Sequence, residues 1–210
     1  MLPSGRYNTI VADPPWPESG GGRIKRGADA HYPLMPLKDI IGMADWVKGL
    51  VGSEGCHLYL WATNNYLPAA LDVMQAWGFD YRTTITWAKV RDDIPQNPGL
   101  GQYFRGLTEH CLFGVTGHLP YRFAPTEEPK RAQGKTLILA PRGEHSVKPV
   151  ALMEMAELVS YPPRLEMFAR VQRPGWDTWG DGVRTAAMLG AGPASSAASP
   201  MTKGIPLDPV

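Results

Sequence analysis

The sequence is poor in cysteine and contains no long apolar run. Its two cysteines, Cys56 and Cys111, lie inside apolar segments without CxxC spacing, so we interpret them as buried thiols rather than as ligands or a disulfide framework. No window approaches the ~20 consecutive apolar residues of a membrane-spanning helix, and the first residues do not follow the pattern of a secretory signal. We therefore expect a cytoplasmic protein in a reducing compartment, without a membrane segment.

The chain also lacks an excess of charge of either sign. It carries 21 basic and 20 acidic residues, a formal net charge of +1. No global field therefore favours a polyanionic partner, and any nucleic-acid binding must rest on local patches. The five histidines show neither HExxH spacing nor paired Cys/His spacing, so we expect no metal site.

There is enough apolar sequence for one sizeable core. Of the 210 residues, 43% are hydrophobic, and the usual size range of domains gives no reason to divide the chain. We expect a single domain over residues 1–183. Residues 184–210 are rich in Ala, Gly, Ser and Pro, a composition typical of a flexible tail.

Apolar residues alternate along the chain between the period of a strand and that of a helix. We predict a loop over 92–106, which is rich in Gly, Pro and Asn, and a closing strand over 164–170. The other predicted strands span 8–12, 56–63, 81–90, 109–117 and 136–141, and the predicted helices span 35–51, 64–79 and 148–161. This order indicates an α/β fold with a doubly wound, largely parallel sheet, in which ligands bind beyond the carboxyl ends of the strands.

The first predicted strand ends abruptly in Asp13, Pro14, Pro15 and Trp16. Prolines cannot donate to a sheet ladder, so the strand must stop there. An exocyclic amine of a nucleobase attacks an electrophile only if its N–H bonds are held, and the Asp13 carboxylate and a free Pro14 carbonyl supply two acceptors. Trp16 offers a face for an extruded base, a contact worth roughly 1–3 kcal/mol. From the tetrapeptide alone, a plain turn with Trp16 in the core remains the alternative.

Further segments extend this motif into a family resemblance. "ADPPW" is followed in order by "LYLWATNNYLPAALDVMQAWGFDYRTTITWAKV", "TEHCLFGVTG", "HSVKP" and "RLEMFARVQRPGWDTWGD". Over residues 7–182 the chain resembles the MT-A70 family of permuted adenine-N6 methyltransferases. The resemblance implies a class I S-adenosylmethionine-dependent methyltransferase fold, Rossmann-like, with the catalytic motif before the cofactor motif. The implied cofactor is S-adenosylmethionine.

The resemblance also implies roles for individual residues. The catalytic motif is Asp13, Pro14, Pro15 and Trp16, and the residues implied to bind the cofactor are Asp13, Lys148, Glu166, Phe168, Arg170 and Asp181. Lys148 corresponds to the family lysine that meets the methionine carboxylate, and Arg170 lies near the ribose or that carboxylate. The chain departs from the family at Asp181, where Asn is common and a carboxylate can still accept from a ribose hydroxyl, and at Ala169, where Gly is common.

Contacts with the substrate are expected from loops as well as from the motif. Tyr32 matches a family aromatic that lines the acceptor side, and Trp61 matches the family tryptophan on the next strand; both are expected, with Trp16, to contact the substrate. The remaining expected contacts are Arg23, Lys25 and Arg26, which could meet phosphates on either side of a flipped nucleotide, and Tyr103 and Arg105, which could clamp the other side. The alternative for the basic loop is an ordinary solvated surface.

The function implied is transfer of a methyl group to N6 of adenine in nucleic acid. DNA is preferred over RNA because compact members of the family resemble phage and bacterial modification enzymes. Two rivals remain: a non-catalytic subunit that binds nucleic acid for a partner, in which the tetrapeptide is typically degraded, and a cytosine-N4 enzyme. The expected partner is nucleic acid, with a homodimer or a partner subunit also possible.

Overall fold

The computed structural model describes residues 3–17, 34–91, 94–95, 103–123, 130–143 and 147–180. Several predicted features lie outside these ranges, namely Arg23, Lys25, Arg26, Tyr32, Asp181 and the tail over 184–210. No helix within the described ranges is long and apolar enough to cross a membrane.

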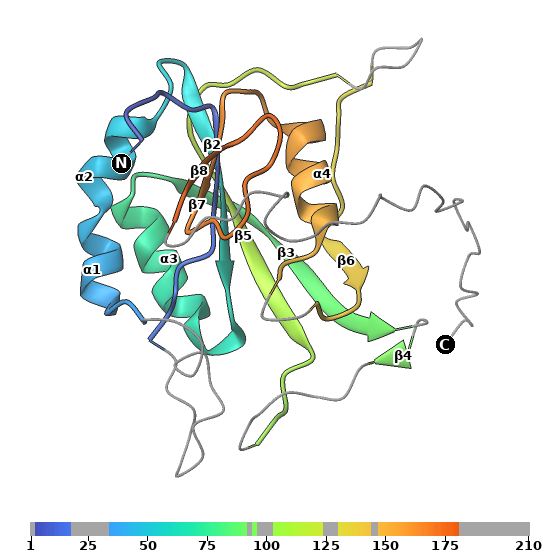
Figure 1. Cartoon of the computed structure of the whole chain (residues 1–210). Coiled ribbons are helices and arrows are strands. Elements are labelled where there is room, and N and C mark those ends of the chain that lie inside the picture. The colour runs from blue at the N-terminus through green and yellow to red at the C-terminus, as the bar shows by residue number, and fades with distance from the viewer. Residues whose placement is uncertain are drawn as a thin grey trace.

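An eight-stranded sheet forms the centre of the molecule, in the order β4-β3-β5-β2-β1-β7-β8 with β6 paired to β3 (Figure 1). Its strands are β1 (Thr9–Ala12), β2 (Gly55–Ala62), β3 (Asp80–Arg91), β4 (Ile94–Pro95), β5 (Thr108–Gly117), β6 (Leu137–Ala140), β7 (Arg164–Met167) and β8 (Asp177–Trp179). Strand β1 runs parallel to both of its neighbours, β2 and β7. Strands β7 and β8 are also parallel to each other, and so are β3 and β6. Among the described strands only β5 and β4 run the opposite way. The predicted α/β fold with a largely parallel sheet is confirmed.

Helices cover both faces of this sheet. Figure 1 shows α1 (Leu37–Gly42), α2 (Ala44–Leu50) and α3 (Leu67–Ala76) on one face and α4 (Val150–Val159) on the other. The alternation of side chains along β1 explains this arrangement. Ile10 and Ala12 belong to the core cluster with α1 to α3, whereas Val11 belongs to the cluster with α4. Buried on both faces, β1 reads as the continuous apolar run seen in the sequence.

Three details of the prediction are wrong. The helix predicted over 35–51 is two helices, because Gly42 weakens the helix and the Met43 N–H bonds back to Ile40, which tightens the turn. The loop predicted over 92–106 contains β4, which pairs with the end of β3. The strand predicted to close the sheet is followed by β8, whose three residues are too short a pattern to recognise. A 3₁₀ turn, η2 (Asn64–Tyr66), also precedes α3.

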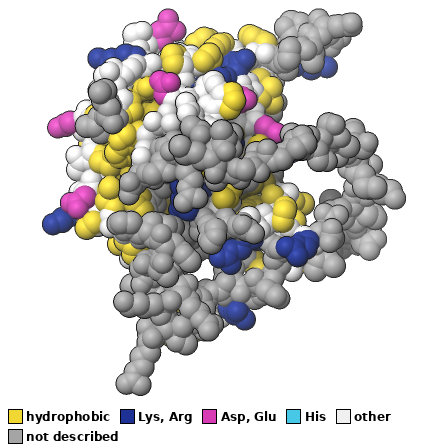
Figure 2. Space-filling view, in the orientation of Figure 1, with side chains coloured by type: hydrophobic (Ala, Val, Ile, Leu, Met, Phe, Trp, Pro, Cys, Tyr) yellow, Lys and Arg dark blue, Asp and Glu magenta, His cyan; other side chains and the backbone are white. Residues whose placement is uncertain are grey.

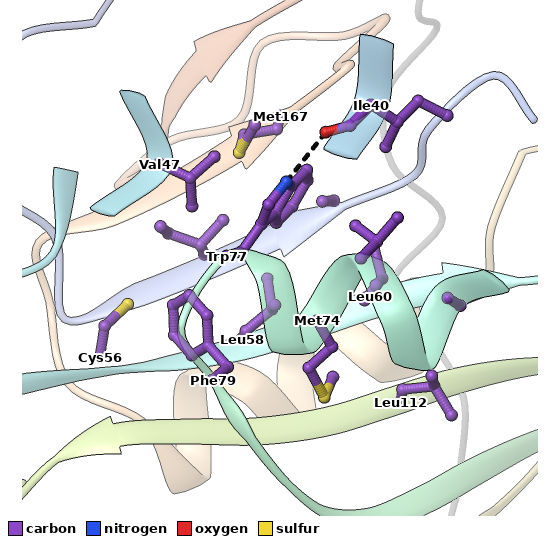
Figure 3. Close-up of a cluster of buried hydrophobic side chains, with 14 of the residues drawn as sticks. Ile40, Val47, Cys56, Leu58, Leu60, Met74, Trp77, Phe79, Leu112 and Met167 are labelled. Carbon is purple, nitrogen blue, oxygen red and sulfur yellow. Dashed lines mark hydrogen bonds between the residues drawn. The ribbon is translucent and has the colours of Figure 1, made fainter. Parts of the chain in front are cut away.

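Trp77, at the end of α3, is a central side chain of the larger core. It is fully buried, and its indole N–H donates to the Ile40 carbonyl at 3.0 Å (Figure 3). We expect Trp77→Phe to lower the free energy of unfolding by about 2 kcal/mol, because ring volume is lost and the Ile40 carbonyl loses its partner. Urea denaturation of both proteins measures the difference. An unchanged midpoint would contradict this role.

The amino end of β2 is tied to the end of α4 by a polar cluster. His57 Nδ1 and the Tyr59 hydroxyl lie 2.7 Å and 2.8 Å from the Oγ of Ser160, which is fully buried directly after α4. Burial lowers the pKa of His57 below its usual value. The native state therefore favours the neutral imidazole, and this cluster stabilises the fold most when the ring is uncharged.

This cluster predicts a loss of stability in mild acid. The unfolded chain takes up a proton at His57 near pH ~6.5, the ordinary value, whereas the folded protein does so only at lower pH. The free energy of unfolding should thus fall through this residue as the pH drops below about 6.5. His57→Gln should remove that part of the slope in urea denaturation between about pH 7.5 and about pH 5.5. Equal slopes in both proteins would count against the assignment.

Candidate active site

Asp13 stands at the carboxyl ends of three neighbouring parallel strands. It follows β1 directly, and the register places Ala12 opposite Leu60 of β2 and opposite Met167 of β7. The residues that follow these strands therefore meet Asp13 at one edge of the sheet. In doubly wound folds this edge binds ligands.

The two prolines close a tight turn after Asp13. The backbone N–H of Trp16 donates to the Pro14 carbonyl at 2.8 Å, and that of Met35 donates to the Pro15 carbonyl at 2.9 Å. The prediction that the Pro14 carbonyl is free is thus wrong, because the turn brings the Trp16 N–H back onto it. A carbonyl oxygen has two lone pairs, so one acceptor position remains.

The structure places Trp16 in the core rather than at an open surface. Only 5% of Trp16 is exposed, its ring stacks on Tyr66 with centroids 5.5 Å apart, and its indole N–H donates to the Trp61 carbonyl at 3.0 Å. Contrary to the prediction from the sequence, Trp16 therefore does not present an open face on which a base could stack. Burial of a large aromatic with a satisfied N–H is strongly favourable, and here it fixes the turn that carries Asp13.

A chain of alternating charges leads away from Asp13 along the sheet edge. The Nζ of Lys148 lies 2.8 Å from Asp13 Oδ2 and 3.3 Å from Glu109 Oε2. The other oxygen of Glu109 lies 2.6 Å from the Nζ of Lys89. We call these four residues the charge ladder. Its side chains come from the residue after β1, from the segment before α4, and from β5 and β3.

The charges in the ladder stabilise one another in a partly dry environment. The side chain of Lys148 is 20% exposed and that of Glu109 16% exposed. Burial alone would lower the pKa of Lys148, but the carboxylates of Asp13 and Glu109 outweigh it and raise that pKa. Burial would raise the pKa of Glu109, and Lys148 and Lys89 outweigh it and lower that pKa. Lys148 is thus a cation and Glu109 an anion near neutral pH, so neither serves there as a general base or acid.

A pocket opens between β1, β7 and the start of α4. Its volume is about 610 Å³, the open solvent at its mouth included. Both charged and apolar side chains form its wall. The lining includes Asp13, Lys148, Glu166, Arg170 and Arg173 as well as Val11, Trp61, Leu152, Met153 and Phe168. Five of the six residues predicted to bind the cofactor therefore share one pocket, and the sixth, Asp181, lies outside the described residues.

The backbone around the end of β7 is tightly constrained. Phe168 has φ 60°, a left-handed conformation that non-glycine residues adopt rarely. The next N–H, from Ala169, donates to the Trp179 carbonyl of β8 at 2.9 Å. A Cβ at Gly180 would overlap backbone atoms of Ala169, so β8 can follow β7 closely only with glycine there. Such constrained backbone is frequent where a chain binds a ligand.

The family model described as MT-A70 matches residues 7–182 of the chain. The protein belongs to the MT-A70 family. This match covers every strand that carries the pocket and the ladder, and it confirms the predicted resemblance. The family is one of S-adenosylmethionine-dependent methyltransferases, as the α/β fold with its largely parallel sheet leads one to expect.

Characterised relatives of this MT-A70 protein differ in length. It is 28% identical to the type II methyltransferase M.MunI of a Mycoplasma species over 86% of this chain and 79% of the relative. It is 27% identical to the N(6)-adenosine-methyltransferase subunit METTL3 of Danio rerio, covering 28% of that protein, and 26% identical to the N6-methyladenosine RNA methyltransferase MTA1 of Pyricularia oryzae, covering 47%. The chain thus spans less than half the length of these two relatives.

Within this MT-A70 domain, the predicted substrate residues that the structure describes do not form one surface. Trp61 is 2% exposed and contributes to the pocket wall, with Lys148 5.5 Å above its ring, instead of facing an acceptor base. Tyr103 and Arg105 lie in the segment before β5 and do not line the pocket. Glu166 pairs with Arg173 at 3.2 Å. Burial raises the pKa of Glu166 above its usual value, because it outweighs the opposite effect of Arg173.

Sequence reasoning missed Glu109 and Lys89. Glu109 stands in "TEHCLFGVTG" and Lys89 in "TITWAKV", and both segments were recognised only as parts of the family pattern. The residues lie on neighbouring antiparallel strands, where β3 and β5 pair Trp87 with Glu109. Their separation along the chain carries no short motif, so only strand pairing reveals the contact.

Proposed function

We propose that this protein transfers a methyl group from S-adenosylmethionine to the N6 amine of adenine in DNA. One observation carries the proposal: the Asp13 carboxylate, held by Lys148 at the carboxyl end of β1, borders the pocket that both residues line with β7. Family membership supports the reaction class.

The pocket suits a ligand with an amino-acid end and a nucleoside end. Lys148 and Asp13 offer opposite charges for a carboxylate and an ammonium group. Glu166 adds oxygens suited to ribose hydroxyls, and Val11 and Phe168 add apolar wall. S-adenosylmethionine, when bound, supplies an electrophilic methyl group.

The chain's own groups hold the amine that accepts the methyl group. Lys148 occupies Oδ2 of Asp13, so we assign Oδ1 and the second lone pair of the Pro14 carbonyl to the two N–H bonds of the adenine amine. Trp16 keeps the turn in place from within the core. Since the methyl donor is already activated, positioning of the amine supplies most of the catalysis.

The choice of DNA rests on the type II methyltransferase, to which the chain is 28% identical over 79% of that relative. Type II enzymes modify DNA. Figure 2 shows several lysine and arginine side chains on the lower half of this face, and such cations would suit the phosphates of a nucleic acid. Strands β2 and β3 point toward that half in Figure 1. Cytoplasmic location, and the need for a homodimer or a partner subunit, remain predictions.

The test is transfer of labelled methyl from S-adenosylmethionine to unmethylated duplex DNA, single-stranded DNA and RNA, followed by nucleoside mass analysis. We expect N6-methyladenine in DNA and none with Asp13→Ala. N6-methyladenine found only in RNA would mean that the substrate is RNA and not DNA. A methyl group found on cytosine would mean that the protein is a cytosine methyltransferase. Cofactor binding without any product would favour the subunit that binds nucleic acid for a partner.

A further inference from the structure

Two adjacent aromatic side chains project into solvent just before β5. Tyr103 and Phe104 are each 92% exposed. Large aromatic rings normally gain stability by burial, and two neighbouring rings exposed to this extent indicate a surface that meets another molecule. Neither ring lines the pocket. We call this pair the aromatic tip.

The aromatic tip is presented from a fixed base. The backbone N–H of Lys89 donates to the Leu107 carbonyl at 2.9 Å. The Asn64 amide donates to the carbonyl and hydroxyl oxygens of Thr108 at 3.1 and 3.3 Å, and its own oxygen lies 2.8 Å from His110 Nε2. Strand β3 and the turn η2 therefore hold its base, while the two rings stay outside.

The tip belongs to the same edge of the sheet as Asp13. Phe104 is five residues before Glu109 of the charge ladder, so the chain between them spans at most about 18 Å. Glu109 in turn contacts Lys148, which contacts Asp13. In Figure 1 the segment that leads into β5 extends below the body of the domain, on the side to which β2 points.

We propose that the aromatic tip stacks into base-paired DNA beside the target adenine and occupies the space that this base leaves when it turns out of the helix. The inference rests on the proposed function. An amine inside a duplex cannot reach Asp13, so the base must leave the stack, and unstacking costs energy. Base–aromatic stacking tolerates every sequence because each base has a π-face. Two exposed rings at the rim of the site match that need.

The decisive experiment compares Phe104→Ala and Tyr103→Ala with a matched control, Phe123→Ala. Phe123 is also exposed, and it lies beyond the opposite end of β5 in a bridge with Arg131. The wild-type reaction first identifies the adenine that is methylated. The kcat/KM for methyl transfer is then measured on a fully paired duplex that contains this adenine, and on the same duplex with an abasic site opposite it.

We expect Phe104→Ala to lower kcat/KM on the paired duplex by about tenfold to a hundredfold, and to change it much less opposite the abasic site, where the base is already unpaired. Tyr103→Ala should behave similarly, and Phe123→Ala should match the wild type. Equal losses on both substrates, or no loss, would overturn the inference. A tip variant that changes the oligomeric mass in light scattering would also overturn it, since the tip would then be a protein interface.

Failure of the proposed function is a separate result. If the wild type methylates no adenine, fluorescence anisotropy still tests the tip, with a labelled duplex that contains one unpaired adenine and with its fully paired counterpart. Weaker binding of the fully paired duplex by Phe104→Ala, with little change in the affinity for the unpaired duplex, would support the tip. The same affinities in wild type and variant would overturn it.

Discussion

Asp13→Asn is expected to lower kcat for methyl transfer by about a hundredfold to a thousandfold, the usual effect of removing one preorganised electrostatic contact. The substitution keeps the shape of the side chain but removes its charge, and the amide places a donor where the adenine N–H bonds need an acceptor. Lys148 retains its contact with Glu109, so the pocket should persist. Single-turnover kinetics measure the effect on methyl transfer, and calorimetry measures any effect on the binding of S-adenosylmethionine.

A matched substitution controls for the loss of an acidic residue. Asp72 is exposed on α3, on the face of the sheet covered by α1 to α3, and it lies outside the pocket. Asp72→Asn should leave kcat and cofactor affinity as in the wild type. If Asp13→Asn kept its activity within about threefold while thermal melting stayed unchanged, positioning of the amine by Asp13 would be refuted.

Glu109→Gln is expected to lower the free energy of unfolding by about 2 kcal/mol and kcat/KM by roughly tenfold. It removes the anion between two lysines that are 15% and 20% exposed, so two cations then share a partly dry space. The loss is below the 3–5 kcal/mol of fully buried pairs because solvent still reaches these groups. Urea denaturation and methyl-transfer kinetics measure the two effects.

The contribution of Glu109 to stability should depend on pH. Because the lysines hold the pKa of Glu109 below its ordinary value, its contribution to stability is fully present above about pH 4.5 and is lost as the pH falls through the folded-state value. The stability difference between wild type and Glu109→Gln should therefore shrink in acid. A difference that stayed constant across that range would mean that packing, not charge, explains the loss.

Two further variants separate charge from structure in the ladder. Glu54 is exposed in the turn before β2, and Glu54→Gln should leave stability unchanged. In Glu109→Gln, Lys89 and Lys148 no longer have an anion between them. Adding Lys89→Met removes one of these two cations and should restore part of the lost free energy of unfolding. Purely additive losses in this double-mutant cycle would contradict a direct interaction between Lys89 and Glu109.

The sequence by itself determined where Asp13 stands and in what kind of sheet. An apolar run that ends in two prolines can only be a strand that stops there, and alternation of strand and helix then places its end at the ligand-binding edge. The segments from "HSVKP" and "RLEMFAR" supplied Lys148, Glu166, Phe168 and Arg170, which share one pocket with Asp13. The position of Asp13 follows from local patterns and chain order, whereas the other four residues were assigned by the family resemblance of their segments; both were available before the fold was known.

Only the tertiary structure decided which groups are open and which are paired. Trp16 and Trp61 look like stacking surfaces in sequence, yet each finds more apolar contact inside the protein than at its edge. Glu109 joins Lys148 and Lys89 because β5 reverses direction between β2 and β3 and brings its first residues back to the catalytic edge. Contacts of this kind depend on strand pairing between segments distant in the chain, and no short-range pattern of residues encodes them.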